Sequence, residues 1–333
     1  MLNLRSATYR HRLRRATMTN PWATIPGPGV RGIDLEIKSG CILGLVGPNG
    51  AGKTTLMQIL AGILDLEDGH IQLDGTPIRT EQQHLNLCAS VGYMPESVSW
   101  VGPSTPNHIL SRLCAMRGVQ TSEGEEILKL VGLSKRVDDD LSTLSKGMRQ
   151  RLSLATALLG EPRILILDEP LNGLDPVAQS AFRTLLRQLA QRGTAIVISS
   201  HSLTDLERII DEVALMHRGR IVESGPLSTI ERDLGIFARL DIAGMGSTPE
   251  SFGDEIRAEP QHPHKGEDWA YRLHLEQGDW TAQMRASIQN ELTITRMNPV
   301  SADLEEVLTA ATGLSVEDSG FDVFTDVEVE EDE

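Results

Sequence analysis

The sequence predicts an α/β protein built on a parallel sheet, with a helical insert and a small α+β domain that follows it. From about residue 32 to residue 233, short apolar runs alternate with segments of helical periodicity, as in a parallel sheet covered on both faces. Several of these runs are apolar along their whole length, which is typical of strands buried on both sides. After about residue 235 the pattern changes to short strands, a loop rich in Gly, Pro and His, and a helix.

The core strands are predicted from the apolar runs Cys41–Val46, Val91–Met94, Arg163–Leu167, Ala195–Ser199 and Glu212–Met216. The Asp74-Gly75 pair between two β-like runs predicts a hairpin from His70 to Ile78. Between residues 97 and 161 the apolar residues recur at helical spacing instead, over Pro106–Met116, Ser122–Leu130 and Gly147–Leu159. We therefore expect a helical subdomain inserted into the α/β body. Beyond residue 235 we expect strands at Ala238–Ile242 and Tyr271–Leu275, a loop at 244–266 and a helix at Thr281–Ile288.

Composition and charge exclude several classes of protein. With 40% hydrophobic and 23% charged residues, the chain of 333 residues has the composition of a globular protein. No apolar run approaches the roughly 18 to 20 residues that cross a bilayer. The three cysteines form no C-x-x-C pair, which fits a reducing compartment. The net charge is −16. Residues 1–17 contain five arginines and residues 317–333 contain nine acidic residues, so the residues between these two segments carry −12. A body of this charge argues against nucleic-acid binding, which needs a basic patch.

Residues 47–54 match G-x-x-x-x-G-K-[ST], the P-loop or Walker A motif. Its glycines let backbone N–H groups point at phosphate oxygens, and the helix expected at Thr55–Leu64 adds the positive end of its dipole. Lys53 is expected to reach the β- and γ-phosphates, and Thr54 is expected to ligate Mg²⁺. The predicted nucleotide-binding residues are Gly47, Pro48, Asn49, Gly50, Ala51, Gly52, Lys53, Thr54 and Thr55.

Two carboxylates end the apolar strand before Pro170. Asp168 can hold Mg²⁺ through water, as a Walker B aspartate does, and Glu169 is then placed to accept a proton from the attacking water. Taken alone, a strand that ends in Asp-Glu is commonplace, but a P-loop in the same chain favours the catalytic interpretation. His201 follows another predicted strand, and its place near the phosphate site favours a contact with the γ-phosphate over a packing role.

Together these residues resemble the ATP-binding cassette (ABC) ATPases. The deciding feature is the run from Leu144 to Leu152, which is similar to the family signature. Residues 172–175 resemble the D-loop, residues 93–96 the Q-loop and His201 the switch histidine. The resemblance implies a P-loop NTPase fold with the following roles: catalysis by Glu169 and His201, a signature acting on the opposite subunit at Leu144, Ser145, Lys146, Gly147 and Met148, a D-loop aspartate at Asp175, and Mg²⁺ near Thr54, Asp168 and Glu96.

The chain departs from the family pattern in three places. Glu96 stands where Gln is usual, and Lys146 and Met148 replace Gly and Gln of the common signature. This form of the signature resembles that of bacterial exporters of the ABC-2 type. The adenine-stacking aromatic residue of the family should lie some 20 to 25 residues before the P-loop, where Trp22 is the nearby candidate.

The resemblance implies an ATPase subunit that uses ATP and Mg²⁺ and dimerises head to tail, as a homodimer or with a paired ABC subunit. Its partner would be a separate multi-span permease, so that the chain lies at the cytoplasmic face of the cell membrane and drives export. Two alternatives remain open: a membrane complex for metalloprotein maturation or signalling, and a soluble ABC ATPase of DNA repair or translation. The sequence shows neither the heptads nor the second P-loop of the soluble kinds.

Four regions follow from these patterns: a basic N-terminal extension at 1–19, the ABC ATPase domain at 20–235, an α+β domain at 236–315 and an acidic tail at 316–333. The extension could touch anionic lipid headgroups, serve organellar targeting, be a disordered tail, or precede a true start at Met18. The acidic tail is expected to be solvated. Residues 301–308 resemble the short helix that closes the C-terminal domain of ABC-2 type ATPases.

Overall fold

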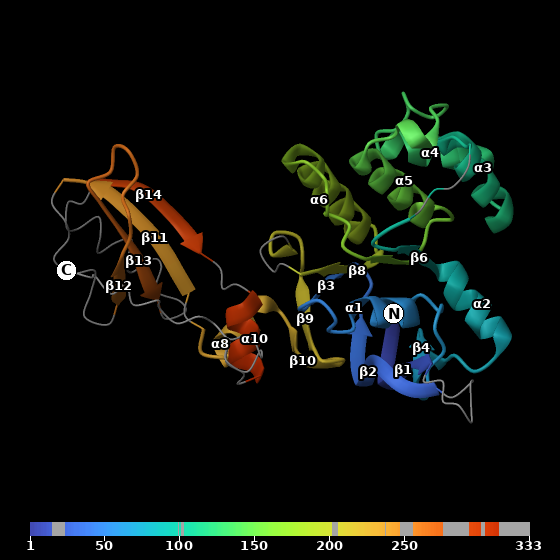
Figure 1. The fold of residues 1–333 in the computed structure, drawn as a ribbon, viewed down its shortest axis with the longest axis horizontal. Coiled ribbons are helices and arrows are strands. Elements are labelled where there is room, and N and C mark those ends of the chain that lie inside the picture. Colours follow the sequence, from blue (N-terminus) through green and yellow to red (C-terminus); the bar gives the residue numbers. More distant parts are fainter. Residues whose placement is uncertain are drawn as a thin grey trace, which may run out of the picture. The chain divides into compact units, whose positions relative to one another are not determined.

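The computed structural model describes residues 1–14, 24–98, 100, 103–201, 206–236, 238–246, 256–275, 293–300 and 304–312. The chain forms two compact units, Met1–Leu227 and Ser228–Glu333 (Figure 1). The division therefore lies before the boundary expected after residue 235. Among the described residues, no helix is both long enough and apolar enough to cross a membrane.

A six-stranded sheet forms the centre of the first unit, in the order β10-β9-β3-β8-β7-β6. Its strands are β3 (Ile42–Val46), β6 (Val91–Met94), β7 (Ile164–Leu167), β8 (Ala195–Ser200), β9 (Glu212–His217) and β10 (Arg220–Gly225). All pair in parallel except β10, which runs antiparallel to β9. The five predicted core strands are confirmed to within one residue, and every residue of β3, β7 and β8 is buried. Because parallel strands share their carboxyl edge, the P-loop, the two carboxylates and His201 all emerge at one edge.

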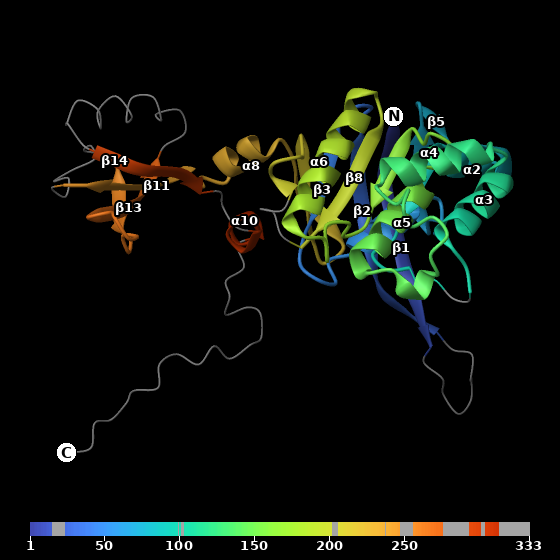
Figure 2. The same ribbon diagram turned by 90° about the horizontal axis from the view of Figure 1, so that it is seen from above.

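Helices α1 (Lys53–Leu60), α2 (Glu81–Ser90) and α6 (Pro176–Gln191) belong to the same unit. The start of α6 is encoded locally, because Asp175 Oδ1 accepts the Ala178 N–H at 2.8 Å and Pro176 occupies the first turn. The predicted helical insert is present between β6 and β7, as α3 (Pro106–Arg117), α4 (Thr121–Leu130), the 3-10 turn η1 (Leu141–Thr143) and α5 (Lys146–Leu158). Figure 2 shows these helices beside the central sheet.

A second sheet in this unit corrects the interpretation of the N-terminus. Its order is β2-β1-β4-β5, with β1 (Leu2–Arg14), β2 (Thr24–Ile37), β4 (Asp68–Leu73) and β5 (Thr76–Pro77). The predicted hairpin at 70–78 is confirmed as β4 and β5. Residues 2–14 are not an extension outside the ATPase domain: β1 pairs with both β2 and β4. Residues 15–23, which include Met18 and Trp22, lie outside the described residues.

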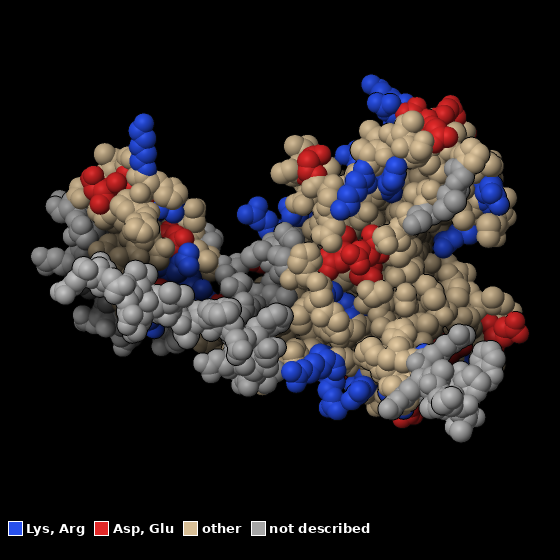
Figure 3. Space-filling view, in the orientation of Figure 1, with Lys and Arg blue, Asp and Glu red and all other residues tan. Residues whose placement is uncertain are grey.

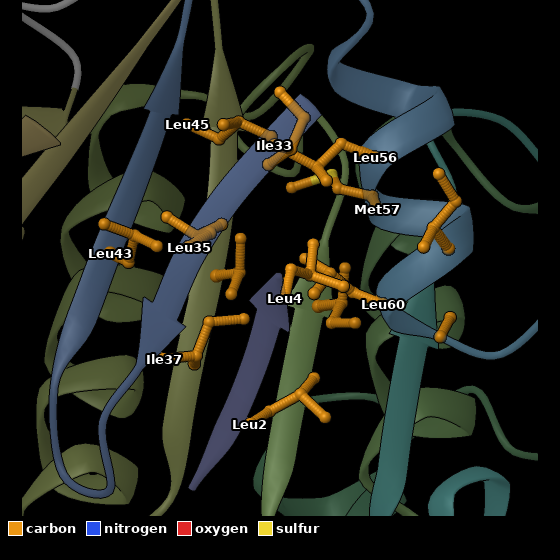
Figure 4. Close-up of a cluster of buried hydrophobic side chains, with 14 of the residues drawn as sticks. Leu2, Leu4, Ile33, Leu35, Ile37, Leu43, Leu45, Leu56, Met57 and Leu60 are labelled. Carbon is orange, nitrogen blue, oxygen red and sulfur yellow. The ribbon is translucent and has the colours of Figure 1, made fainter. Parts of the chain in front are cut away.

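Strand β1 has an apolar face that its high arginine content did not indicate. Leu2, Leu4 and Ala7 are fully buried, whereas the arginine side chains Arg5 and Arg12 are exposed. Figure 4 shows Leu2 and Leu4 among the side chains of β2, β3 and α1. Alternation of this kind places one face of a strand on the core and the other in water. The arginines Arg5, Arg10 and Arg12 of β1 are thus all exposed to solvent.

The second unit contains a four-stranded antiparallel sheet in the order β12-β13-β11-β14. Its strands are β11 (Ala238–Met245), β12 (Arg257–Pro260), β13 (Trp269–Leu275) and β14 (Thr293–Val300), accompanied by helix α10 (Leu304–Thr312); α8 (Leu227–Asp233) precedes them. The predicted strands at 238–242 and 271–275 are confirmed, but β12 lies within the segment expected to be a loop. A buried cluster of Leu240, Ile242, Trp269 and Leu273 packs on one face. The expected helix at 281–288 and the acidic tail lie outside the described residues.

Candidate nucleotide-binding and hydrolysis site

A pocket of about 440 Å³ lies at the carboxyl edge of the central sheet. It brings the P-loop together with both carboxylates, with the Q-loop position Glu96 and with His201, as predicted. The lining residues are His11, Pro28, Gly29, Asn49, Gly50, Ala51, Gly52, Lys53, Thr54, Thr55, Glu96, Asp168, Glu169, Asn172 and His201. A larger cavity of about 580 Å³ lies at the amino ends of β7 and β8, but no motif residue lines it. Volume alone therefore does not identify the site.

The P-loop is shaped by close backbone approach. Gly52 has φ of +103°, and a Cβ at Gly47 would lie 2.3 Å from the Met216 carbonyl oxygen, so a larger residue is excluded there. Helix α1 begins at the next residue, Lys53, and its first intrahelical hydrogen bond runs from the Leu56 N–H to the Gly52 carbonyl, so the amides before Leu56 have no helical carbonyl to bond. This arrangement presents backbone N–H groups to an anion.

Lys53 is buried inside the loop, with an exposed fraction of 7%. Its Nζ donates to the Gly47 carbonyl at 2.7 Å and lies 3.9 Å from Glu169 Oε1. Burial lowers the pKa of Lys53, while the negative charges of Glu169 and Asp168 oppose that shift. Gly47 and Pro48 do not line the pocket, and their part in the site is to accept hydrogen bonds from this ammonium group.

Asp168 is almost fully buried directly after β7. Its Oδ1 accepts a hydrogen bond from Ser199 Oγ at 2.6 Å, and its backbone N–H donates to the Met94 carbonyl. Its second oxygen, Oδ2, is buried without a hydrogen-bond partner among the described residues. An unpaired buried carboxylate oxygen requires compensation, which a hydrated cation would provide. The residues present therefore fit a Mg²⁺ ion.

The donor set fits Mg²⁺ more closely than a transition metal. Thr54 and Glu96 line the pocket with Asp168, and all three offer oxygen. In the part of the chain that the structure describes, no group of three or more His, Cys, Asp or Glu side chains is placed to hold a metal ion. Mg²⁺ in nucleotide sites needs only one or two carboxylates together with phosphate oxygens and water.

Glu169 is held by contacts on both carboxylate oxygens. Oε2 lies 3.1 Å from His201 Nδ1 and accepts a hydrogen bond from Asn172 Nδ2 at 3.3 Å. The backbone of Glu169 has φ of +48°, a left-handed conformation that costs a non-glycine residue about 1 kcal/mol or more. Such a conformation persists because surrounding contacts hold it, and those contacts set where the Glu169 side chain starts. Asn172 was not among the predicted site residues.

The signature residues do not line the pocket in the same chain. Ser145 caps α5, with its Oγ accepting the Met148 N–H at 3.3 Å, and Leu144 is buried beside it. Asp175 likewise caps α6 instead of facing the pocket. Gln150, on α5, connects the signature helix to the carboxylate segment, because its Nε2 donates to the Pro170 carbonyl at 3.3 Å. A role for Ser145 in binding nucleotide therefore requires a second copy.

Like Asn172, His11 lines the pocket but was not among the predicted site residues. It lies on β1, its Nε2 is 3.1 Å from Thr55 Oγ1, and its ring packs edge-on against Tyr9 at 5.1 Å. It precedes Gly47 by 36 residues, outside the 20 to 25 expected, because the paired strands β1 and β2 extend to Arg14 and Thr24. In the sequence, the aromatic rings at the alternate positions 9 and 11 were the pattern that could have indicated this residue.

Acidic side chains gather in the middle of the face of the first unit shown in Figure 3, with basic side chains above and below them. Three carboxylates, of Glu96, Asp168 and Glu169, line the pocket together with the buried ammonium group of Lys53. A polyphosphate would add further negative charge to this surrounding. A divalent cation would offset part of that charge.

Comparison with known proteins agrees with this geometry. Residues 30–172 match the ABC transporter family. The chain is 34% identical over 286 residues to the bacitracin transport ATP-binding protein BcrA of Enterococcus faecalis, covering 85% of this chain and 91% of that protein. It is 30% identical to the Nod factor export ATP-binding protein I of Burkholderia orbicola, covering 87% and 93%. A solved ATP-binding subunit of an ABC transporter superposes with a TM-score of 0.59 at 26% identity, covering 71% and 93%.

The alignment with BcrA extends through nearly the whole of that relative, so the likeness includes more than the P-loop region alone. The pocket also contains groups of the kinds that ATP hydrolysis needs: a phosphate-binding loop, a buried carboxylate and side-chain oxygens that could hold a cation. The chain belongs to the ATP-binding proteins of ABC transporters and is an ATPase.

Proposed function

We propose that the chain is the ATP-hydrolysing subunit of an exporter, which dimerises on ATP and drives a separate membrane permease. The observation that carries the ATPase part is the position of Glu169 between Lys53 and His201 in the P-loop pocket. The export part is supported by the names of two relatives, one a bacitracin transport protein and the other a Nod factor export protein. The signature form with Lys146 and Met148 supports the same assignment.

Different residues of the pocket bind the phosphates, hold the cation and activate water. The P-loop N–H groups bind the phosphates, and Lys53 exchanges the Gly47 carbonyl for a phosphate oxygen. Thr54, Asp168 and Glu96 hold Mg²⁺, which neutralises charge on the phosphates when bound. Glu169 takes the proton of the attacking water, and His201 orients Glu169 through the 3.1 Å contact.

The signature acts from a second copy of the chain or from a paired ABC subunit. Ser145 and Gly147 lie at the start of α5, and Ser145 is exposed. A helix N-terminus is favourable for an anion, so this end would complete the site of the partner around the γ-phosphate. Hydrolysis then removes the bridging phosphate and opens the dimer, which is the step passed to the permease at the cytoplasmic face of the membrane.

His11 is our candidate for the adenine-stacking residue; the sequence had offered Trp22 as the nearby candidate, and Trp22 lies outside the described residues. His11 lines the pocket beside Pro28 and Gly29 and is held by Thr55, a residue of the phosphate-binding segment. An imidazole ring in this position offers an aromatic face to a base.

The proposal is tested by purifying the Glu169→Gln variant from mildly solubilised membranes with ATP and Mg²⁺ and identifying bound chains by mass spectrometry. A stoichiometric multi-span membrane protein is expected. The matched control is the Lys53→Ala/Glu169→Gln double variant, which should bind ATP poorly and should retain less of the partner. A soluble dimer alone, or one bound to ribosomes or DNA, would contradict the transporter assignment.

A further inference from the structure

Ser199 occupies a position that no motif assigned to the reaction. It is the fifth residue of β8, it is 1% exposed, and β8 lies between β3 and β7 in the sheet. Asp168 and Glu169 follow the neighbouring strand β7. The Ser199 hydroxyl is therefore placed beside both carboxylate residues, away from solvent.

One hydroxyl group contacts both residues. Ser199 Oγ donates to Asp168 Oδ1 at 2.6 Å and accepts the backbone N–H of Glu169 at 2.8 Å. Each contact satisfies a polar group that is buried and would otherwise need another partner. The donor bond engages one Asp168 oxygen, and the other oxygen, Oδ2, has no hydrogen-bond partner among the described residues.

The second contact acts on the backbone of the base. Glu169 adopts φ of +48°, and a strained conformation persists only where surrounding contacts hold it. The Ser199 acceptor bond is one such contact, and the Gln150 side chain, 3.5 Å from the Glu169 carbonyl, is another. Ser199 thus contributes to the orientation of the carboxylate that contacts Lys53 and His201.

We propose that Ser199 is a positioning residue that sets the Mg²⁺-binding oxygen of Asp168 and the backbone of Glu169 through a single hydroxyl. The proposal rests on the roles given above to Asp168 and Glu169. Partners of metal-binding carboxylates commonly change metal affinity or activity by 10- to 100-fold when they are removed. The loss of Ser199 should therefore affect the metal and the base together.

The first test measures binding without turnover. Two variants are compared, Glu169→Gln and Glu169→Gln/Ser199→Ala. The Kd of ATP is measured for each in the presence of Mg²⁺ and again in the presence of EDTA. We expect Ser199→Ala to raise the Kd with Mg²⁺ about tenfold and to leave the Kd in EDTA unchanged. An unchanged Kd with Mg²⁺ would overturn the proposal, and so would an equal rise in EDTA, which would indicate general distortion of the pocket.

The second test measures turnover in the otherwise native chain. Ser199→Ala should lower kcat about tenfold or more and raise the Mg²⁺ concentration needed for half-maximal rate. Ser153→Ala is the matched control, because Ser153 is a serine 4% exposed in the middle of α5 and does not line the pocket. Ser199→Thr, which keeps the hydroxyl, should recover part of the rate. If Ser153→Ala causes the same loss, Ser199 has only a structural role.

Failure of the proposed function and failure of the Ser199 proposal give different results. If Glu169→Gln hydrolyses ATP at the parent rate, the base assignment is wrong and the proposal for Ser199 falls with it. If Glu169→Gln is inactive while Ser199→Ala keeps the parent rate and the parent Mg²⁺ dependence, only the proposal for Ser199 is wrong.

Discussion

His201 Nδ1 lies 3.1 Å from Oε2 of Glu169, whereas the other carboxylate oxygen of Glu169 is 3.9 Å from the Lys53 ammonium group. Each carboxylate oxygen thus has a different partner: His201, which follows β8, and Lys53, which lies in the P-loop. The His201 side chain is half exposed, but the carboxylate is buried. The pocket therefore holds a buried carboxylate whose two neighbours can be tested separately.

Replacing Glu169 by Gln should abolish turnover and leave ATP binding intact. The amide keeps the shape of the side chain but cannot accept the proton of water, and general-base catalysis is worth about 10²- to 10⁴-fold in rate. The measurements are phosphate release and ATP binding by calorimetry. We also expect ATP to trap a dimer, visible by light scattering. Turnover equal to that of the parent would remove Glu169 as the base.

Replacing His201 by Ala should slow turnover by about tenfold or more with little effect on ATP affinity, because the variant loses a contact that orients Glu169. Asn172→Ala offers a comparison, since its longer 3.3 Å contact reaches the same oxygen. Single-turnover rates with excess enzyme separate this effect from binding. Equal losses of rate and of ATP affinity would show that His201 acts on binding instead.

Replacing His11 by Ala should weaken ATP binding about fivefold, corresponding to about 1 kcal/mol, the low end for stacking of a base on an aromatic side chain. The affinity for inorganic triphosphate should fall much less, because the variant leaves the P-loop in place and loses only the 3.1 Å contact between His11 and Thr55. His11→Tyr should keep the ATP affinity. Competition binding with both ligands gives the comparison, and equal losses for ATP and triphosphate would argue against adenine contact.

Replacing Leu4 by Ala should reduce the free energy of unfolding by about 2 to 5 kcal/mol, because Leu4 is fully buried between β2 and α1. The control is Leu13→Ala on the same strand, which is 46% exposed and should change stability by less than about 0.5 kcal/mol. A chain begun at Met18 would lack β1 and should not fold stably. Urea unfolding measures the variants, and equal stabilities for Leu4→Ala and the parent would contradict the burial of β1.

Asp74 should make a pH-dependent contribution to stability. Asp74 accepts hydrogen bonds from Arg163 and from the N-terminal ammonium group. These bonds, the one from Arg163 most strongly, lower the pKa of Asp74 to about 2. Because the folded-state pKa is depressed, the contribution is present above pH 4, near the unfolded value, and is lost as the pH falls towards 2. The pair is exposed, so its size should stay below about 1 kcal/mol.

Urea titrations of Asp74→Asn and the parent from pH 7 to pH 3 check this expectation. The difference in unfolding free energy should be constant down to pH 4 and shrink below it. Asp65→Asn, at an exposed position of the same unit, is the control. A difference that grows as the pH falls would reverse the assigned sign.

The parts of the site that lie in contiguous motifs could be predicted without the structure. The P-loop, Asp168 and Glu169 follow apolar strands that are buried in full, so local spacing identified both the strands and the residues after them. Three apolar helical runs likewise predicted the insert between β6 and β7. These features depend on neighbours in the chain, which a sequence displays directly.

Tertiary structure decided what depends on distant segments. Strand β1 became central to a sheet because its alternate leucines meet β2, β4 and α1, although its arginines dominate its composition. The same strand brings His11 to Thr55, and the parallel pairing of β7 with β8 brings Ser199 to Asp168. Which strands pair depends on which apolar faces can be buried together, and those faces come from residues tens of positions apart in the sequence.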